Sequence, residues 1–188
     1  MARRTTFYHI GRTTPGLTNT RSLHRSKSMD ITEITDQLQF PEGPIAMPDG
    51  SVILVEIMRG TLSRVMPDGE IQVVAEPGGG PNGAAMGPDG HCYICNNGGF
   101  EWSRSSRGLI FPGNQASDYT TGRIEKINVE TGAVEKLYTH CDGEPLKGPN
   151  DIVFDREVDS GLQIMERTVR GIGIARASTM RPLMANTS

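Results

Sequence analysis

Residues 41–50 read Pro-Glu-Gly-Pro-Ile-Ala-Met-Pro-Asp-Gly, and residues 81–90 repeat the pattern as Pro-Asn-Gly-Ala-Ala-Met-Gly-Pro-Asp-Gly. Residues 149–155 open a third copy, Pro-Asn-Asp-Ile-Val-Phe-Asp. In the first two copies a short apolar segment meets a Pro-Asp-Gly turn. Proline presets φ there, the aspartate can bond its own backbone, and glycine accepts a positive φ. Each copy therefore predicts a β-strand, and the first two predict a hairpin.

The spacing of the copies indicates the architecture. Three further strands are predicted between the first two copies, at residues 51–57, 61–66 and 70–75. The copies begin at residues 41 and 81, so four strands fit into about 40 residues, the size of one β-propeller blade. The sequence thus predicts an all-β chain built from propeller blades.

The second blade contains an insertion. Residues 96–122 show no strand periodicity and are rich in Gly, Ser and Arg, which predicts a long loop on one face. Strand patterns resume at 123–129 and 133–140. The predicted boundaries are about 36–80 for blade 1, about 81–148 for blade 2 and 149–155 for the start of blade 3, within a partial propeller at 29–155. The fold class is therefore a propeller truncated to about two blades plus the start of a third.

The N-terminal 28 residues differ from the rest of the chain. They carry six Lys or Arg and no acidic residue, and they lack the apolar segment of a secretory signal. Their composition resembles a transit peptide, and the competing interpretations are that Met29 is the physiological start or that the segment is a disordered extension. We expect a cytoplasmic protein, or an organellar one if residues 1–28 direct transit.

The rhythm of strands and turns stops at the C-terminal end. Residues 156–188 have neither period-2 nor period-3.6 patterning of apolar residues. We interpret them as an aberrant tail from a frame change or splice, or as a disordered extension.

Charge and composition exclude several partners. The net charge is −3, and residues 29–155 carry most of the acidic side chains, whereas nucleic-acid binding requires a clustered basic face. No apolar segment reaches the roughly 20 residues that span a bilayer. We therefore expect no nucleic-acid and no membrane partner. Three cysteines are too few for a disulfide framework, which favours a reducing compartment.

Polar residues recur beside the first strand of each predicted blade, at Glu42, Asn82 and the pair Asn150-Asp151. The innermost strands of a propeller converge on its central channel, so these side chains should meet there. Glu42 lies beside an apolar strand, where burial of an unpaired carboxylate would be costly and a cation would offset the cost. Carboxylate and amide oxygens favour Ca²⁺ or Mg²⁺. The competing interpretation is that these residues only cap turns.

Two other groups of residues have less specific patterns. Cys92 and Cys95 are separated by an odd offset, which places them on opposite faces of a strand and favours core packing over a metal or redox site. Trp102 with Arg104 and Arg107 could form a lid or a partner patch, but the pattern favours an ordinary exposed loop.

Four motifs in order resemble one family: Phe-Pro-Glu-Gly-Pro at 40–44, Gly-Pro-Asn-Gly at 80–83, Cys-Asn-Asn-Gly-Gly-Phe-Glu-Trp at 95–102 and Gly-Pro-Asn-Asp-Ile-Val-Phe-Asp at 148–155. The chain is similar over about residues 36–155 to the senescence-marker-protein/gluconolactonase/luciferin-regenerating-enzyme family. Paraoxonases are more distant relatives.

The resemblance implies a six-bladed propeller that hydrolyses a sugar lactone or a related small lactone with a divalent cation in its channel. The expected ion is Ca²⁺, with Zn²⁺, Mg²⁺ and Mn²⁺ as alternatives. Glu42 and Asn150 match metal ligands, and Asn82, Asn150 and Asp151 are the expected substrate-binding residues. The catalytic aspartate and a further asparagine ligand are expected from later blades, so no catalytic residue is assigned here.

Two departures bear on activity. Gly148 stands where some members of the family place a substrate-binding arginine, and the later blades are not part of the predicted fold. We therefore expect impaired activity. The competing interpretation is a non-catalytic propeller fragment or binding scaffold that self-associates through exposed blade faces.

Overall fold

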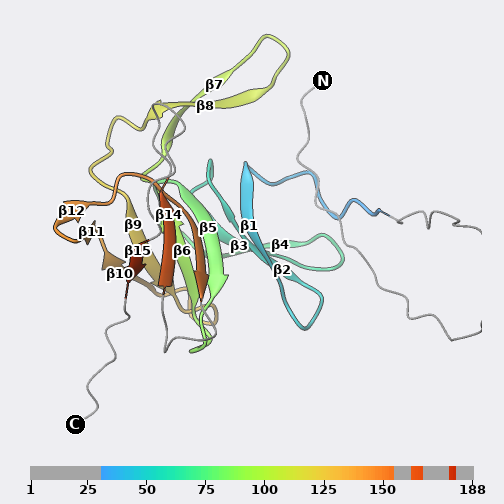
Figure 1. The fold of residues 1–188 in the computed structure, drawn as a ribbon. Helices are drawn as coiled ribbons and strands as arrows, with labels where there is room; N and C mark the ends of the chain where they lie inside the picture. Colours follow the sequence, from blue (N-terminus) through green and yellow to red (C-terminus); the bar gives the residue numbers. More distant parts are fainter. Residues whose placement is uncertain (1–30, 155–161, 167–177, 181–188) are drawn as a thin grey trace, which may run out of the picture.

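The computed structural model describes residues 31–154, 162–166 and 178–180, and these residues form antiparallel β-sheets (Figure 1). The predicted N-terminal extension lies outside the described residues, as does the tail predicted over 156–188 except for two short strands. Among the described residues, no helix has the length and apolar character needed to cross a membrane.

The first sheet is a four-stranded meander in which each strand pairs with the next. Its strands are β1 (Pro41–Ala46), β2 (Val52–Glu56), β3 (Thr61–Val65) and β4 (Ile71–Ala75). The Pro-Asp-Gly turns form as the sequence predicts. Asp49 Oδ1 accepts a hydrogen bond from the Ser51 amide at 3.1 Å, and Gly50 adopts a φ of 84°.

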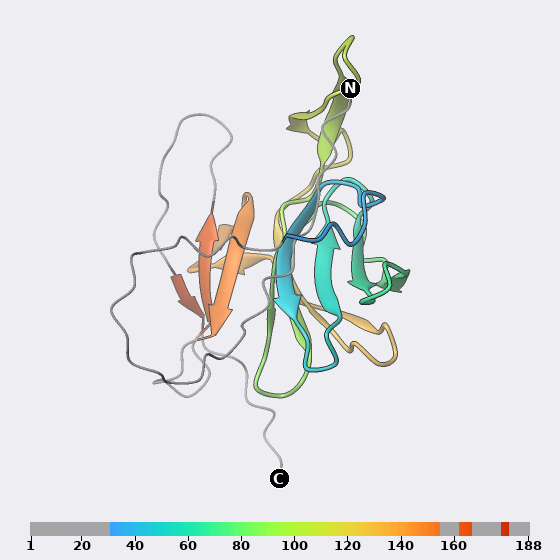
Figure 2. The same ribbon diagram turned by 90° about the vertical axis from the view of Figure 1, so that its right-hand side faces the viewer.

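The second sheet has the order β10-β9-β6-β5. Its strands are β5 (Pro81–Met86), β6 (Cys92–Asn96), β9 (Arg123–Ile127) and β10 (Val134–Tyr138). The prediction of a structureless loop at 96–122 is wrong in part. The segment contains a hairpin of β7 (Phe100–Arg104) and β8 (Ile110–Gln115), which projects away from the sheets (Figure 2). The apolar alternation in this segment is limited to Phe100 and Trp102 of β7, and β8 is mostly exposed, so the sequence shows no sustained strand pattern.

The third sheet has the order β13-β14-β15. Its strands are β13 (Pro149–Phe154), β14 (Leu162–Glu166) and β15 (Ser178–Met180), so two strands fall within the tail predicted over 156–188. A small hairpin of β11 (His140–Cys141) and β12 (Glu144–Pro145) precedes it.

Two apolar clusters hold neighbouring sheets together. Buried residues of the first and second sheets form one cluster: Ile53, Val55, Leu62, Ala75, Cys92, Ile94 and Ile127. The second cluster joins the second and third sheets and contains Cys95, Ile124, Leu146 and Ile152. Cys92 and Cys95 thus pack into different cores from opposite faces of β6, as their odd offset predicts. The sheets are stacked face to face, which is the packing of propeller blades.

The innermost strands of the three sheets lie side by side, because β5 contacts both β1 and β13 (Figure 1). Glycines allow this approach. A Cβ on Gly43 would lie 2.6 Å from the Ala84 nitrogen, and a Cβ on Gly83 would lie 2.4 Å from the Asn150 carbonyl oxygen. Neither position has room for a side chain, so the glycines set the spacing of β1, β5 and β13.

Candidate functional site

The candidate site lies along the innermost strands, at the second residue of each. Glu42, Asn82 and Asn150 occupy this place in β1, β5 and β13. The strand pairing is irregular at each position, between Glu42 and Ile45, around Asn82, and around Asn150. β-Bulges redirect side chains and are common beside active sites. Three neighbouring strands therefore carry a bulge and a polar side chain at the same level.

Hydrogen bonds join two of these strands. Asn82 Nδ2 donates to Asn150 Oδ1 at 2.7 Å, and Asn150 Nδ2 donates to Asp151 Oδ2 at 3.0 Å. The first bond links residues 82 and 150, which are far apart in the sequence. The structure thus brings Asn82, Asn150 and Asp151 together, and the two bonds fix the orientation of the Asn150 amide.

Glu42 is placed differently from the expectation. Its side chain is exposed, and no hydrogen bond or ion pair joins it to another of the residues that the structure describes. The expected cost of burying this carboxylate is therefore absent, because water solvates it. The argument that burial requires a cation at Glu42 is wrong, and the carboxylate is instead free to accept a ligand from solvent.

The atoms available to bind a cation at the start of β1, β5 and β13 are side-chain oxygens. Two exposed carboxylates, Glu42 and Asp151, flank the amides of Asn82 and Asn150. The chemistry of this set fits a hard cation such as Ca²⁺, although Ca²⁺ takes 6–8 oxygens and these side chains would supply only part of the shell. Within residues 31–154 and the two short strands beyond, no cluster of three His, Cys, Asp or Glu side chains is arranged to hold a metal.

A buried carboxylate supports the first strand of the site. Glu56, at the end of β2, has no exposed surface. Its Oε1 accepts hydrogen bonds from Ser63 at 2.6 Å and Thr61 at 3.4 Å and lies 3.1 Å from Arg59, while Oε2 accepts the Gln39 amide at 2.6 Å. The last bond holds the backbone that leads into β1 and Glu42.

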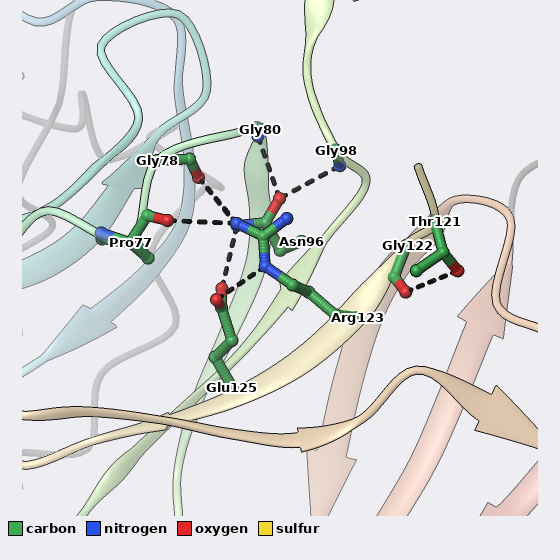
Figure 3. Close-up of polar contacts among 9 residues, drawn as sticks. All are labelled: Pro77, Gly78, Gly80, Asn96, Gly98, Thr121, Gly122, Arg123 and Glu125. Carbon is green, nitrogen blue, oxygen red and sulfur yellow. Dashed lines mark hydrogen bonds and ion pairs between the residues drawn. The ribbon is translucent and has the colours of Figure 1, made fainter. Parts of the chain in front are cut away.

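The second sheet has a matching network at the end of β6 (Figure 3). Asn96 Oδ1 accepts the Gly80 and Gly98 amides at 2.9 and 3.0 Å, and its Nδ2 donates to the Gly78 carbonyl and to Glu125. Arg123 Nε donates to Glu125 at 2.6 Å, and its guanidinium also reaches the carbonyl of Pro77. This network holds the backbone that leads into β5 and Asn82.

Sequence reasoning missed both networks. The available signal was positional, because Glu56 pairs with Pro41 in the β1–β2 register and Asn96 pairs with Pro81 in the β5–β6 register. In both sheets, a polar residue ends an apolar strand, β2 or β6. It pairs with the proline that begins the preceding strand, β1 or β5.

Cys92 has no part in the site. Burial raises the pKa of its thiol to about 12, so the thiol stays protonated and inert at neutral pH. This agrees with its place in the core between the first two sheets.

Comparison with known proteins decides the family. The model of the SMP-30/Gluconolactonase/LRE-like region matches residues 40–159, well over half of the chain and the whole of the site. This chain belongs to the SMP-30/Gluconolactonase/LRE-like family. No curated protein sequence matches at a significant level.

Solved structures agree on the fold of the SMP-30/Gluconolactonase/LRE-like chain. A gluconolactonase from Xanthomonas campestris superposes with a TM-score of 0.52 at 17% identity, covering 73% of this chain and 38% of that one. A candidate gluconolactonase superposes at 0.51 and 19% identity, covering 78% of this chain and 45% of that one. The chain therefore spans less than half of these structures. The predicted family and the predicted all-β, propeller-type fold are confirmed, while the site residues and the cation remain predictions.

Proposed function

We propose that this chain carries the cation- and substrate-binding part of a site that hydrolyses a sugar lactone or a related small lactone. The observation that carries the proposal is the alignment of three bulged innermost strands, two of which are joined by the Asn82–Asn150 hydrogen bond. Family membership and the gluconolactonase-like fold support this class of substrate.

Each residue then has a distinct role. Glu42 and Asn150 hold a divalent cation, with Ca²⁺ favoured by the oxygen donors. Asn150 Oδ1 has two lone pairs, so it can ligate a cation while accepting the hydrogen bond from Asn82 Nδ2. Asn82 and Asp151 bind substrate and keep the Asn150 amide oriented. When bound, the cation polarises the lactone carbonyl and makes bound water more acidic.

We expect purified residues 1–188 to show little turnover of a lactone substrate. The described side chains provide too few oxygens for a full Ca²⁺ shell, and no aspartate in them is assigned to water activation. Weak cation binding and background lactone hydrolysis are therefore the expected properties. Metal-dependent turnover by the purified chain would contradict the assignment of the catalytic group to other parts of a propeller.

The decisive variant is Glu42→Gln, which removes a formal charge while keeping the shape of the side chain. We expect it to lower Ca²⁺ affinity more than tenfold in a full-length homologue, and to lower the weaker Ca²⁺ affinity of this chain in the same direction, both by calorimetric titration. Glu135→Gln is the matched control, since Glu135 is exposed on β10, outside the site. Equal affinities of wild type and Glu42→Gln would reduce Glu42 to a turn residue and favour a non-catalytic scaffold.

A further inference from the structure

The backbone immediately before the site has an unusual conformation at Phe40. Its φ is 59°, in the left-handed region that bulky residues rarely adopt. Among the described residues, Asp142 is the other non-glycine residue with a positive φ. Strained backbone of this kind persists only where its surroundings hold it, and it concentrates at functional sites. Phe40 lies two residues before Glu42, so its conformation sets the direction in which β1 begins.

The backbone around Phe40 is held by the first sheet. The Phe40 carbonyl accepts a hydrogen bond from the Ile57 amide at 3.0 Å, and the Gln39 carbonyl accepts one from the Met58 amide at 3.3 Å. The Gln39 amide in turn donates to the buried Glu56 carboxylate. These bonds hold the backbone before and after the Phe40 Cα, but they do not involve its side chain.

The side chain of Phe40 is held by the hairpin of β7 and β8. Its ring centroid lies 5.0 Å from that of Trp102, which also meets Phe100 at 6.0 Å with the rings nearly perpendicular, at 85°. Trp102 and Phe100 belong to β7, in the hairpin that leaves the second sheet directly after Asn97. The hairpin inserted into the second sheet therefore contacts the first sheet at the entry to β1.

We propose that Trp102 is a positioning residue for Glu42. Its ring holds Phe40 in the left-handed conformation, and this conformation directs β1 so that the Glu42 carboxylate lies level with Asn82 and Asn150. The effect on cation binding rests on the function proposed above, whereas the effect on the backbone does not. Trp102 thus couples the projecting hairpin to the site instead of forming an ordinary exposed loop.

Substitutions at Phe40 separate backbone conformation from packing. Glycine adopts a positive φ at no steric cost, so Phe40→Gly keeps the backbone geometry available after the ring is lost, whereas Phe40→Ala does not. At the partner ring, Trp102→Phe keeps an aromatic contact and Trp102→Ala removes it. Phe111→Ala is the matched control, because Phe111 is 48% exposed on the same hairpin.

The first measurement is amide hydrogen exchange at Ile57, whose N–H is bonded to the Phe40 carbonyl. We expect exchange to be at least tenfold faster in Phe40→Ala and Trp102→Ala than in wild type. Phe40→Gly, Trp102→Phe and Phe111→Ala should stay within about threefold of wild type, and the β3 amides serve as the reference for global stability. Equal exchange in Phe40→Ala and Phe40→Gly, or unchanged exchange in Trp102→Ala, would overturn the proposal.

The second measurement is Ca²⁺ affinity of the same variants. Phe40→Ala and Trp102→Ala should weaken binding at least fivefold, and Phe40→Gly should recover most of it. If wild type binds no Ca²⁺, the proposed function fails while the exchange pattern still decides the role of Trp102. If the exchange pattern holds and Ca²⁺ affinity is unchanged by Trp102→Ala, the coupling to Glu42 is wrong.

Discussion

The first and second sheets each bury a carboxylate beside the backbone that leads into the innermost strand. The carboxylate comes from a different strand in each sheet. In the first sheet it is Glu56 on β2, which binds the hydroxyls of Ser63 and Thr61 on β3. In the second sheet the place of Glu56 is taken by Asn96, and the carboxylate is Glu125 on β9. In both sheets, a side chain of the network accepts a hydrogen bond from the backbone that leads into an innermost strand. The accepting atom is in each case a side-chain oxygen that binds a backbone amide, although the residues around that oxygen differ.

The two networks differ in how the charge is balanced. The Arg59 side chain beside Glu56 is 29% exposed, whereas that of Arg123 beside Glu125 is 16% exposed and also binds the carbonyl of Pro77. An arginine near the surface can turn to water if its partner is lost. Arg123 has less freedom to do so, and the second sheet therefore depends more on its ion pair.

The largest effect is expected from Glu125→Ala. The change leaves the Arg123 guanidinium largely buried without its carboxylate, which should cost about 3–5 kcal/mol of unfolding free energy. Glu56→Ala should cost about 2–3 kcal/mol, since Arg59 can reach solvent while the Gln39 amide and two hydroxyls lose an acceptor. Urea denaturation of both variants measures the difference. A larger loss for Glu56→Ala would reverse the comparison.

An intermediate effect is expected where the innermost strands approach each other. Gly43→Ala and Gly83→Ala each place a methyl group against backbone of the neighbouring sheet, which should cost about 1–3 kcal/mol. Gly43 also has a φ of 55°, so its alanine variant carries an additional backbone penalty. The midpoint temperature of thermal unfolding should therefore be lower for Gly43→Ala than for Gly83→Ala. Gly90→Ala is a control for backbone strain alone, because a Cβ there meets nothing within 4 Å.

The smallest effect is expected at Asp49 and Asp89, each of which follows the first strand of a sheet in a Pro-Asp-Gly turn. Burial raises the pKa of Asp89, but hydrogen bonds from Lys126, the His91 amide and Tyr93 together hold it below its ordinary value of 3.8. Hydrogen bonds from Ser51 do the same for the pKa of Asp49 at the equivalent turn, with Arg64 adding to the effect.

A depressed carboxylate pKa stabilises the fold above about pH 4, and this contribution is lost as pH falls through the lower folded value. Asp89→Asn should therefore cost about 0.5 kcal/mol at pH 7, after screening by solvent, and less at pH 2. Asp49→Asn should also lower the unfolding free energy at pH 7, by a smaller amount than Asp89→Asn. Denaturation curves at the two pH values check this, and a pH-independent cost for Asp89→Asn would show that the turn needs the shape of aspartate and not its charge.

Local chemistry made much of the fold predictable. The Pro-Asp-Gly turns and the short apolar segments between them were enough to predict the strands of the first sheet, and the repeat of the motif at Pro81 predicted the second. The hairpin of β7 and β8 was missed, because the apolar alternation of Phe100 and Trp102 is short and β8 is mostly exposed and contains Pro112-Gly113, a pair typical of turns. Asn82 and Asn150 were singled out by their place in the repeat, but the hydrogen bond between them depends on the close approach allowed by Gly83. The exposure of Glu42 could not be read from its neighbours, since it lies on the face of β1 that also exposes Pro44 and Ala46, residues whose apolar character suggested burial.

The insertion of the hairpin also has a kinetic consequence. Residues 57–60 connect β2 to β3, whereas residues 97–122 separate β6 from its partner β9. Closing the longer loop costs about 1.5 kcal/mol more in chain entropy, unless the hairpin forms first and shortens the path. Pairing of strands distant in sequence slows folding. The first sheet should therefore fold early and offer its apolar face for the second sheet to pack against. The second sheet should complete its pairing only after the hairpin has closed and the Phe40 and Trp102 rings are in contact.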